Sequence, residues 1–526
     1  MDSIGCYCYY CMIYIFIADK CSSETRFTLS MYQLSLYEKT GQFDNCIYDK
    51  FSHEDICDQT NRMIIERRYS FLFEKTYKFT RSTASFQGNK DQPLYNWMKY
   101  REGFSHRLVK VLLDELCISV GDYILDPFAG SGTTLLTAQE MGINALGIEL
   151  LPHAHMYWRA KSKAWDYNID ELHYIIGQIR CNACLEGTHA FNHLTITEGA
   201  FLPSIEKELI GYVEWFDSLD ISEDAKILCR TILMSLLEDI SHTRKVGQSL
   251  RWDKDISRKS HENHTYKPII ENTQFQLYDY SSYSVKHLLL IKFNQIISDI
   301  QYLQAYTPLK TRQEVILGNT LYTLPSLQDS LFSAVITSPP YLNRYDYTRT
   351  YALELAFLGI GQDIFKLRQE QLSCTVENKS KLVVLQKYYQ SIGQEQRYHQ
   401  ILNIVHNNQV IAEVKGALNE RYKRTELNNR GVINMAYQYF TELTFVLFEL
   451  YRICKSGATI AFVNDNVRYA GEIIPVDTIT CNLAEQIGFL PHKIYILPQC
   501  KGNSSQQMSK FGRKALRKSI ILLRKA

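Results

Sequence analysis

A glycine-rich turn between two short apolar runs constrains the fold of this chain more than any other feature. Residues 123–128 form an apolar run typical of a buried strand, and the turn at residues 129–132 follows it directly. Apolar residues then recur at helical spacing over residues 133–141. A second apolar run, residues 145–148, ends at Glu149. The sequence therefore predicts a strand, a turn, a helix and a strand, with a carboxylate at the end of the second strand.

This unit suits a ligand that contains a nucleoside and carries a positive charge. Gly130 and Gly132 let the backbone turn sharply and approach a ligand that a Cβ atom would push away. The Glu149 carboxylate can accept hydrogen bonds from both ribose hydroxyls. The GxGxxG fingerprint of dinucleotide sites is absent, and Asp126 would repel a pyrophosphate. An adenosyl group with a sulfonium and an amino acid therefore fits better than NAD, with an ordinary strand–helix turn as the alternative.

Composition and charge indicate a globular protein with a substantial core. The 526 residues allow two to four domains, and a hydrophobic content of 45% supports a large buried interior. The formal charge is only +2, from 58 basic and 56 acidic residues, so a surface that binds nucleic acid must be local. The 14 cysteines show no framework spacing, which favours reduced thiols and a cytoplasmic location.

Neither a membrane segment nor a metal site is predicted. Residues 4–18 are apolar, but this stretch is too short to span a bilayer and lacks the basic start of a signal peptide. Cys6, Cys8 and Cys11 have no second pair of ligands at zinc-site spacing, and the CxxC at residues 181–184 stands alone. Packed or surface thiols are the simpler interpretation of both groups.

A basic stretch stands in the middle of a long insertion, residues 165–307. Amphipathic helices are predicted on both sides of it, over residues 225–240 and 285–303. Basic side chains can follow a phosphate backbone, and interleaved polar side chains can form hydrogen bonds with base edges. We therefore expect DNA contacts here, with a solvated loop as the alternative. The candidate DNA-binding residues are Arg244, Lys245, Gln248, Arg251 and Trp252.

A second motif follows where the chain returns to the predicted sheet. Residues 314–318 are predicted as a third strand that leads to Asn319, and residues 331–336 as a fourth that leads to the segment TSPPY, residues 337–341. Two prolines fix the backbone and remove two N–H donors, which leaves carbonyls that only accept hydrogen bonds. The amino group of a flipped base is a natural donor to such a site, and Tyr341 supplies a stacking face. A plain turn after a strand is the alternative.

The rest of the chain completes an α/β pattern. A polar insertion covers about residues 362–430. The elements predicted after it are a helix over 432–454, a strand over 458–464, a helix over 475–487 and a hairpin of 493–497 with 518–523. The alternation predicts a parallel sheet with an antiparallel pair at its edge.

These motifs resemble those of the amino-group DNA methyltransferases that use S-adenosylmethionine. DPFAGSGT (126–133) is similar to their cofactor motif, TSPPY to their catalytic motif, and EGFSHRLV (102–109) to their methionine-side motif. The resemblance covers residues 87–149 and about 315–359. It implies an α/β fold with a doubly wound, mostly parallel seven-stranded sheet and a large helical insertion as the target-recognition region.

The resemblance also implies roles for individual residues. It implies no metal ligand. Phe104 and Ser105 would hold the methionine end of the cofactor, and its centre would be lined by Asp126, Phe128, Gly130 and Gly132. Glu149 would bind the ribose, and Asn319 would contact the adenine. The residues that would hold the target base are Ser338, Pro339, Pro340 and Tyr341.

The implied organisation has four parts. They are an N-terminal accessory segment (1–85), the cofactor-binding half (86–164), an inserted DNA-recognition region (165–307) and the catalytic half (308–526) with its polar insertion. The implied partners are double-stranded DNA and a restriction endonuclease that acts on the same site. No association with a membrane is implied. Such a protein would work in a prokaryotic cytoplasm, associated with the nucleoid through DNA.

The residue before Pro-Pro-Tyr points to the base that is modified. Ser338 is similar to the cytosine-N4 branch of the family, whereas the adenine-N6 branch more often has Asp or Asn there, so we expect methylation of cytosine N4. Methylation at cytosine C5 would require a thiolate nucleophile, usually in a Pro-Cys pair, and the sequence contains no Pro-Cys dipeptide. Adenine-N6 methylation, guanine-N2 methylation of RNA and a DNA-binding pseudo-enzyme are the alternatives.

Overall fold

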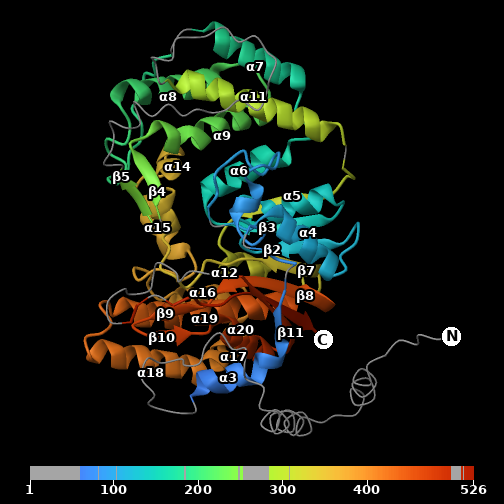
Figure 1. Ribbon diagram of the computed structural model, residues 1–526, viewed down its shortest axis with the longest axis vertical. Helices are drawn as coiled ribbons and strands as arrows, with labels where there is room; N and C mark the ends of the chain where they lie inside the picture. Colours follow the sequence, from blue (N-terminus) through green and yellow to red (C-terminus); the bar gives the residue numbers. More distant parts are fainter. Residues whose placement is uncertain are drawn as a thin grey trace, which may run out of the picture. The chain divides into compact units, whose positions relative to one another are not determined.

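A central sheet of eight strands organises the chain, in the order β1–β11–β12–β8–β7–β2–β3–β6 (Figure 1). The computed structural model describes residues 60–76, 78–80, 82–101, 103–182, 185–246, 249–252, 284–306, 308–498, 511–512 and 514–526. The strands of the sheet are β1 (Phe73–Lys75), β2 (Tyr123–Asp126), β3 (Asn144–Glu149), β6 (Gln313–Leu317), β7 (Phe332–Thr337), β8 (Cys454–Asp465), β11 (Phe489–Leu497) and β12 (Lys518–Lys525). Strands β8, β7, β2, β3 and β6 are parallel, and β12 runs antiparallel to both of its neighbours.

The predicted α/β sheet is confirmed, with one strand more than expected. The additional strand, β1, pairs in parallel with β11 at the edge of the sheet. Its sequence, Phe-Glu-Lys, shows no alternation of apolar and polar residues, so nothing in the sequence marks it as a strand. Backbone hydrogen bonds along the edge of β11 hold this short segment.

Both faces of the sheet are buried, which explains the continuous apolar runs of its strands. Successive side chains point to opposite faces, so Ile124 belongs to one apolar core and Leu125 to the other. Ile520 and Ile521 divide between the two cores in the same way. The first core includes side chains of α4 (His106–Glu115), α5 (Thr133–Glu140) and α6 (Pro152–Ser162), and the second those of α19 (Gly431–Ile453) and α20 (Val476–Ile487).

The long insertion forms a layer of helices and one hairpin. Its helices are α7 (Ile169–Cys181), α8 (Pro203–Ser218), α9 (Glu223–Ile240) and α11 (Val285–Gln304), which pack side by side (Figure 1). Helix α9 also packs on α6 and on α14 (Ala352–Phe357). The predicted helices α9 and α11 are confirmed, and each begins after a serine side chain that accepts a backbone N–H bond, Ser222 and Ser284. Between them, β4 (Thr243–Val246) and β5 (Ser249–Trp252) form an antiparallel hairpin.

The second insertion, expected only as a polar segment, folds into further helices. They are α15 (Asp363–Glu370), α16 (Leu382–Ser391), α17 (Glu395–His406) and α18 (Gln409–Lys423), and the last two pack on α19. Their buried residues recur at helical spacing, as Ile401 and Val405 do on α17, but numerous polar residues conceal the pattern. The remaining elements are short: α12 (Thr320–Thr323), α13 (Tyr347–Thr350), β9 (Val467–Tyr469), β10 (Glu472–Ile474) and the 3-10 helices η1 (Ser70–Leu72), η2 (Phe86–Asn89) and η3 (Leu324–Ser326).

Helix α3 (Asn61–Tyr69) ties the N-terminal segment to the C-terminal half through buried charges. The fully buried Arg517 guanidinium donates two hydrogen bonds to Glu66 of α3 and two to Asp477 of α20, at 2.5–2.9 Å. A buried charge stabilises a fold only when its partners satisfy it in this way. Residues from Asn61 onward are therefore part of the core and not a separate arm.

No helix of the described residues is both long and apolar enough to cross a membrane. In the same part of the chain, no group of three or more His, Cys, Asp and Glu side chains is placed to hold a metal ion. Residues 4–18, with Cys6, Cys8 and Cys11, lie outside the described residues, as does Cys184.

Candidate active site at the carboxyl ends of the strands

A pocket of about 860 Å³, partly open to solvent, lies at the carboxyl ends of β2, β3, β6 and β7. The carboxyl edge of an open parallel sheet is where small-molecule sites form. The predicted site residues among its lining are Phe104, Asp126, Phe128, Gly130, Glu149, Asn319, Ser338 and Pro340. The sequence motifs, more than 200 residues apart in the chain, thus meet in one pocket.

The glycine turn, of which Gly130 but not Gly132 lines the pocket, requires its glycines for two reasons. Gly130 and Gly132 have φ angles of +54° and +83°, which side chains with a Cβ rarely adopt. A Cβ on Gly130 would lie 3.0 Å from the Tyr100 ring, and one on Gly132 would overlap the Trp158 ring. Aromatic side chains of the protein therefore exclude a Cβ atom at both glycines, in addition to any ligand.

Glu149 is fixed by the glycine turn that it faces. The Gly130 N–H donates to Oε2 and the Leu151 N–H donates to Oε1, both at 2.7 Å. Burial raises the pKa of this carboxyl to about 7. Each oxygen keeps a second lone pair, so the oriented carboxylate can still accept hydrogen bonds from a diol.

Asp126 connects the cofactor motif to the catalytic motif. Its Oδ1 accepts hydrogen bonds from the Phe128 N–H (3.1 Å) and the Thr337 hydroxyl (2.7 Å), and its Oδ2 accepts one from the Thr134 hydroxyl (2.6 Å). Burial raises the pKa of Asp126 to about 6. The carboxylate lines the pocket, but its protein partners show that it also holds the ends of β2 and β7 in register.

The segment after β7 folds as a compact turn. The Ser338 hydroxyl donates to the Tyr341 hydroxyl at 3.0 Å, and the Lys518 ammonium lies 5.3 Å from the centre of the Tyr341 ring. Ser338 and Pro340 line the pocket, whereas Pro339 and Tyr341 do not. The serine hydroxyl therefore stands at the boundary between the pocket and the tyrosine.

Two of the residues expected to contact the cofactor have other roles in this structure. The Ser105 hydroxyl is buried, caps α4 by accepting from the Leu108 N–H, and donates to the Thr83 carbonyl at 2.7 Å. It does not line the pocket. The Asn319 side chain caps α12 and donates to the Glu370 carbonyl at 2.8 Å, so it orients the neighbouring chain as well as lining the pocket.

Several pocket residues belong to no motif that the sequence revealed. They are Tyr100, Tyr347, Glu370, Gln371 and Leu372. The last three lie at the end of α15 and directly after it, inside the insertion that was expected to be merely polar. Only the three-dimensional course of the chain brings that segment to the pocket, so no local signal could have identified it.

The hairpin β4–β5 separates the predicted DNA-binding residues into exposed and buried ones. Arg244 and Arg251 stand opposite each other across the two strands and are exposed, and Trp252 is 49% exposed. Lys245 is only 3% exposed, pairs with Glu354, and lies 4.6 Å from the centre of the Tyr351 ring. Gln248 lies outside the described residues.

This placement corrects the expectation for Lys245. Strand side chains alternate, so a hairpin that exposes Arg244 must turn Lys245 inward. Its ammonium is not accessible to a phosphate in this structure, and the Tyr351 ring beneath it stacks on the pocket residue Tyr100 (5.4 Å, 14°). Lys245 thus supports the wall of the pocket.

Comparison with known proteins identifies the family. A family model described as DNA methylase, of the N6/N4 type, matches residues 18–158. The type II methyltransferase M.BsoBI of Geobacillus stearothermophilus is 47% identical over 485 residues, which cover 90% of this chain and 94% of that protein. M.AvaI of a Nostoc species is 37% identical over 465 residues, covering 88% and 92%. M.MjaII of Methanocaldococcus jannaschii is 42% identical over 77 residues, 15% of this chain. The chain belongs to the amino-group, N6/N4 family of DNA methyltransferases.

Proposed function

We propose that this DNA methyltransferase transfers the methyl group of S-adenosylmethionine to the N4 amino group of cytosine in double-stranded DNA. The observation that carries the proposal is that Ser338 and Pro340 open onto the same pocket as Gly130 and Glu149. The names of the relatives, type II methyltransferases, support a role as the modification part of a restriction–modification system. A restriction endonuclease with the same target site would then be its partner in the cell.

The pocket residues fit S-adenosylmethionine. Glu149, held by two backbone N–H groups, offers its remaining lone pairs to the ribose hydroxyls. Phe104 and the glycine turn would receive the methionine end, and the buried Asp126 carboxylate favours a nearby positive charge. When bound, the cofactor supplies a methyl group on a sulfonium, an electrophile that requires no covalent enzyme intermediate.

The catalytic segment would act by orienting the base. The amino nitrogen of cytosine is a poor nucleophile because its lone pair is delocalised into the ring. The Ser338 hydroxyl, which lines the pocket, and the carbonyl of the next residue, Pro339, would accept hydrogen bonds from the amino group and so favour the pyramidal nitrogen that attack on a methyl group requires. Among the described residues, no cysteine lines the pocket, which favours attack by an amino group over thiolate-assisted C5 chemistry.

Mass analysis of nucleosides tests this function. Duplex DNA that contains the target site is incubated with the protein and S-adenosylmethionine, digested and analysed. We expect N4-methylcytosine. N6-methyladenine as the product would overturn the choice of base, since serine can also accept a hydrogen bond from the adenine amino group. Binding of the cofactor without any methylated nucleoside, on DNA of varied sequence, would contradict the proposed transfer.

The exposed face of the β4–β5 hairpin should contact DNA phosphates. Changing Arg244 and Arg251 to Glu should weaken DNA binding and lower the slope of log affinity against log salt by about 2, because each phosphate contact contributes about 0.9 to that slope. Fluorescence anisotropy over a salt series measures both quantities. The same charge change at the exposed Lys423 and Arg424, at the C-terminal end of α18, is the control. Equal losses in the two variants, or none in the hairpin variant, would remove the hairpin from the interface.

Cofactor affinity should depend on pH through Glu149. Ribose hydroxyls donate to the ionised carboxylate, so binding favours the deprotonated form, whose fraction in the free protein falls below a pKa of about 7. Affinity should therefore fall, by up to about tenfold per unit, as the pH drops from about 7 toward 5. Calorimetry in buffers of different ionisation enthalpy should detect proton release at pH 6.

The control for this pH effect is Glu149→Gln. That variant should bind the cofactor weakly, and its cofactor affinity should no longer depend on pH between about pH 6 and 7. Asp126, with a pKa of about 6, still titrates below that range. A pH profile identical to that of the unchanged protein would exclude Glu149 as its source.

A further inference from the structure

Gln371 is a buried amide at the pocket whose two polar atoms are unpaired. The side chain is 5% exposed and lines the pocket, and neither Oε1 nor Nε2 has a hydrogen-bond partner among the described residues. Buried polar groups in folded proteins almost always have partners. An amide with both a donor and an acceptor unsatisfied, at a ligand pocket, therefore points to a ligand that supplies both.

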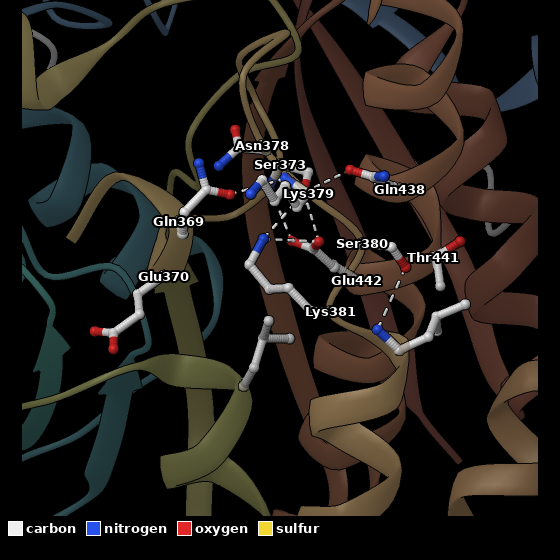
Figure 2. A network of polar contacts seen from close by, with 12 residues as sticks. Gln369, Glu370, Ser373, Asn378, Lys379, Ser380, Lys381, Gln438, Thr441 and Glu442 are labelled. Carbon is white, nitrogen blue, oxygen red and sulfur yellow. Dashed lines mark hydrogen bonds and ion pairs between the residues drawn. The ribbon is translucent and has the colours of Figure 1, made fainter. Parts of the chain in front are cut away.

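The chain on both sides of Gln371 is firmly held. We call residues 370–373 the strap. On one side, the Glu370 carbonyl accepts from Asn319 Nδ2 at 2.8 Å. On the other, the Ser373 N–H and hydroxyl donate to the Glu442 carboxylate at 2.8 and 2.5 Å, and the Lys381 ammonium donates to both Ser373 Oγ and Glu442 (Figure 2).

This clamp fixes the backbone of the strap and leaves the side chain of Gln371 to adjust. Glu442 and Lys381 are themselves buried, so their ion pair is shielded from solvent and holds Ser373 rigidly. The Gln371 amide sits at the end of a side chain with rotatable torsions. It can therefore turn toward a ligand in the pocket without movement of the strap.

The order of the strands indicates which part of the cofactor lies beside the strap. Ser338 follows β7, the glycine turn follows β2, Glu149 ends β3, and Asn319, which holds the strap, follows β6. In the sheet these strands lie in the order β7–β2–β3–β6, about 4.8 Å apart. With the methyl group near Ser338 and the ribose at Glu149, the next group along this line is the adenine, at β6.

The lining at this end of the pocket suits a flat base. Leu321 and Leu372 stand beside Asn319 and Gln371 and offer apolar contact to the faces of a ring. A glutamine amide matches one edge of adenine, since its oxygen accepts from the N6 amino group while its nitrogen donates to an adjacent ring nitrogen. The target base belongs at the other end, beside Ser338.

We propose that Gln371 reads the adenine of the cofactor through both atoms of its amide. This inference rests on the proposed use of S-adenosylmethionine. Gln371 Oε1 accepts a hydrogen bond from the N6 amino group, and Nε2 donates one to the neighbouring ring nitrogen. The Asn319–Glu370 contact and the Ser373–Lys381–Glu442 network are positioning groups that keep the strap at the correct distance.

Calorimetry with S-adenosylhomocysteine and its analogue without the N6 amino group tests the proposal. The unchanged protein should bind S-adenosylhomocysteine about tenfold or more tightly than the analogue, since a good bidentate pair discriminates by about this factor or above. Gln371→Met should bind both ligands with nearly equal affinity. Each ratio is measured within one variant, so it does not depend on the fraction of folded protein.

Gln369→Met is the matched control. Gln369 lies two residues away on α15, and its amide is already paired with the Lys379 N–H and the Glu377 carbonyl (Figure 2 shows Gln369 and Lys379). This variant should keep the discrimination of the unchanged protein. The unchanged protein should bind one of the two analogues, 1-deaza or 7-deaza, less tightly than the adenine ligand. Gln371→Glu, which keeps an acceptor but removes the donor, should still prefer the amino group but should no longer discriminate against that analogue.

The outcomes separate this inference from the proposed function. Failure of the unchanged protein to bind S-adenosylhomocysteine would contradict the cofactor assignment itself. Binding without discrimination, or discrimination that persists in Gln371→Met, would overturn the role of Gln371 alone. A change in the methylated base of DNA with an unchanged ligand ratio would assign Gln371 to the target base, which also overturns the inference.

Discussion

Replacing Gly132 with valine should strongly weaken the binding of S-adenosylmethionine. Gly132 has a φ of +83° and initiates α5, and a Cβ there would overlap the Trp158 ring. Left-handed backbone costs a residue with a Cβ about 1–2 kcal/mol, and overpacking adds about 1–3 kcal/mol. If the turn distorts to relieve the backbone strain and the overlap with the Trp158 ring, the cofactor affinity falls by more than about thirtyfold. Calorimetry with S-adenosylhomocysteine measures the loss.

Gly393→Val is the control for this prediction. Gly393 also has a positive φ, +69°, but a Cβ there would meet nothing within 4 Å, and it lies in the turn between α16 and α17. This variant carries the backbone strain alone, so it should lower the unfolding temperature and leave the cofactor affinity unchanged. Gly130→Val should fall between the two, because its Cβ meets only the Tyr100 ring, at 3.0 Å. Full affinity in Gly132→Val would show that the turn is not part of the cofactor site.

The strands and the glycine turn could be predicted because local sequence determines them. Strands buried on both faces need apolar residues at every position, as at Ile124 and Leu125, and a tight turn with positive φ needs glycine. The two motifs meet because the carboxyl ends of parallel strands lie on one edge of the sheet. These are the parts of the site that follow from short stretches of chain.

The parts that could not be predicted depend on contacts between distant residues. Gln371 reaches the pocket only because Asn319, 52 residues earlier, and Glu442, 71 residues later, clamp the strap. Lys245 was expected on a surface because it stands in a basic stretch, and its buried partner Glu354 is 109 residues away. The hairpin alternation that separates Lys245 from Arg244 becomes visible only once the two strands are assigned.

The aromatic ring of Tyr341 should matter more for turnover than its hydroxyl. If the flipped cytosine stacks on this ring, Tyr341→Ala removes stacking worth about 1–3 kcal/mol and lowers the single-turnover rate by about one to two orders of magnitude. Tyr341→Phe keeps the ring and removes the hydroxyl that accepts from Ser338, so the Ser338 hydroxyl is then available to the base. We expect the rate of the phenylalanine variant to stay within a few-fold of the unchanged protein.

Ser338→Ala separates the serine from the tyrosine. It removes one acceptor for the amino group but leaves the Pro339 carbonyl, so a partial loss is expected, unlike the near-complete loss from removing a nucleophile. Quenched-flow assays on duplex DNA measure all three rates, and calorimetry confirms that cofactor affinity is unchanged. A phenylalanine variant as slow as the alanine variant would show that the Ser338–Tyr341 hydrogen bond, at 3.0 Å, orients the catalytic segment and that stacking contributes little.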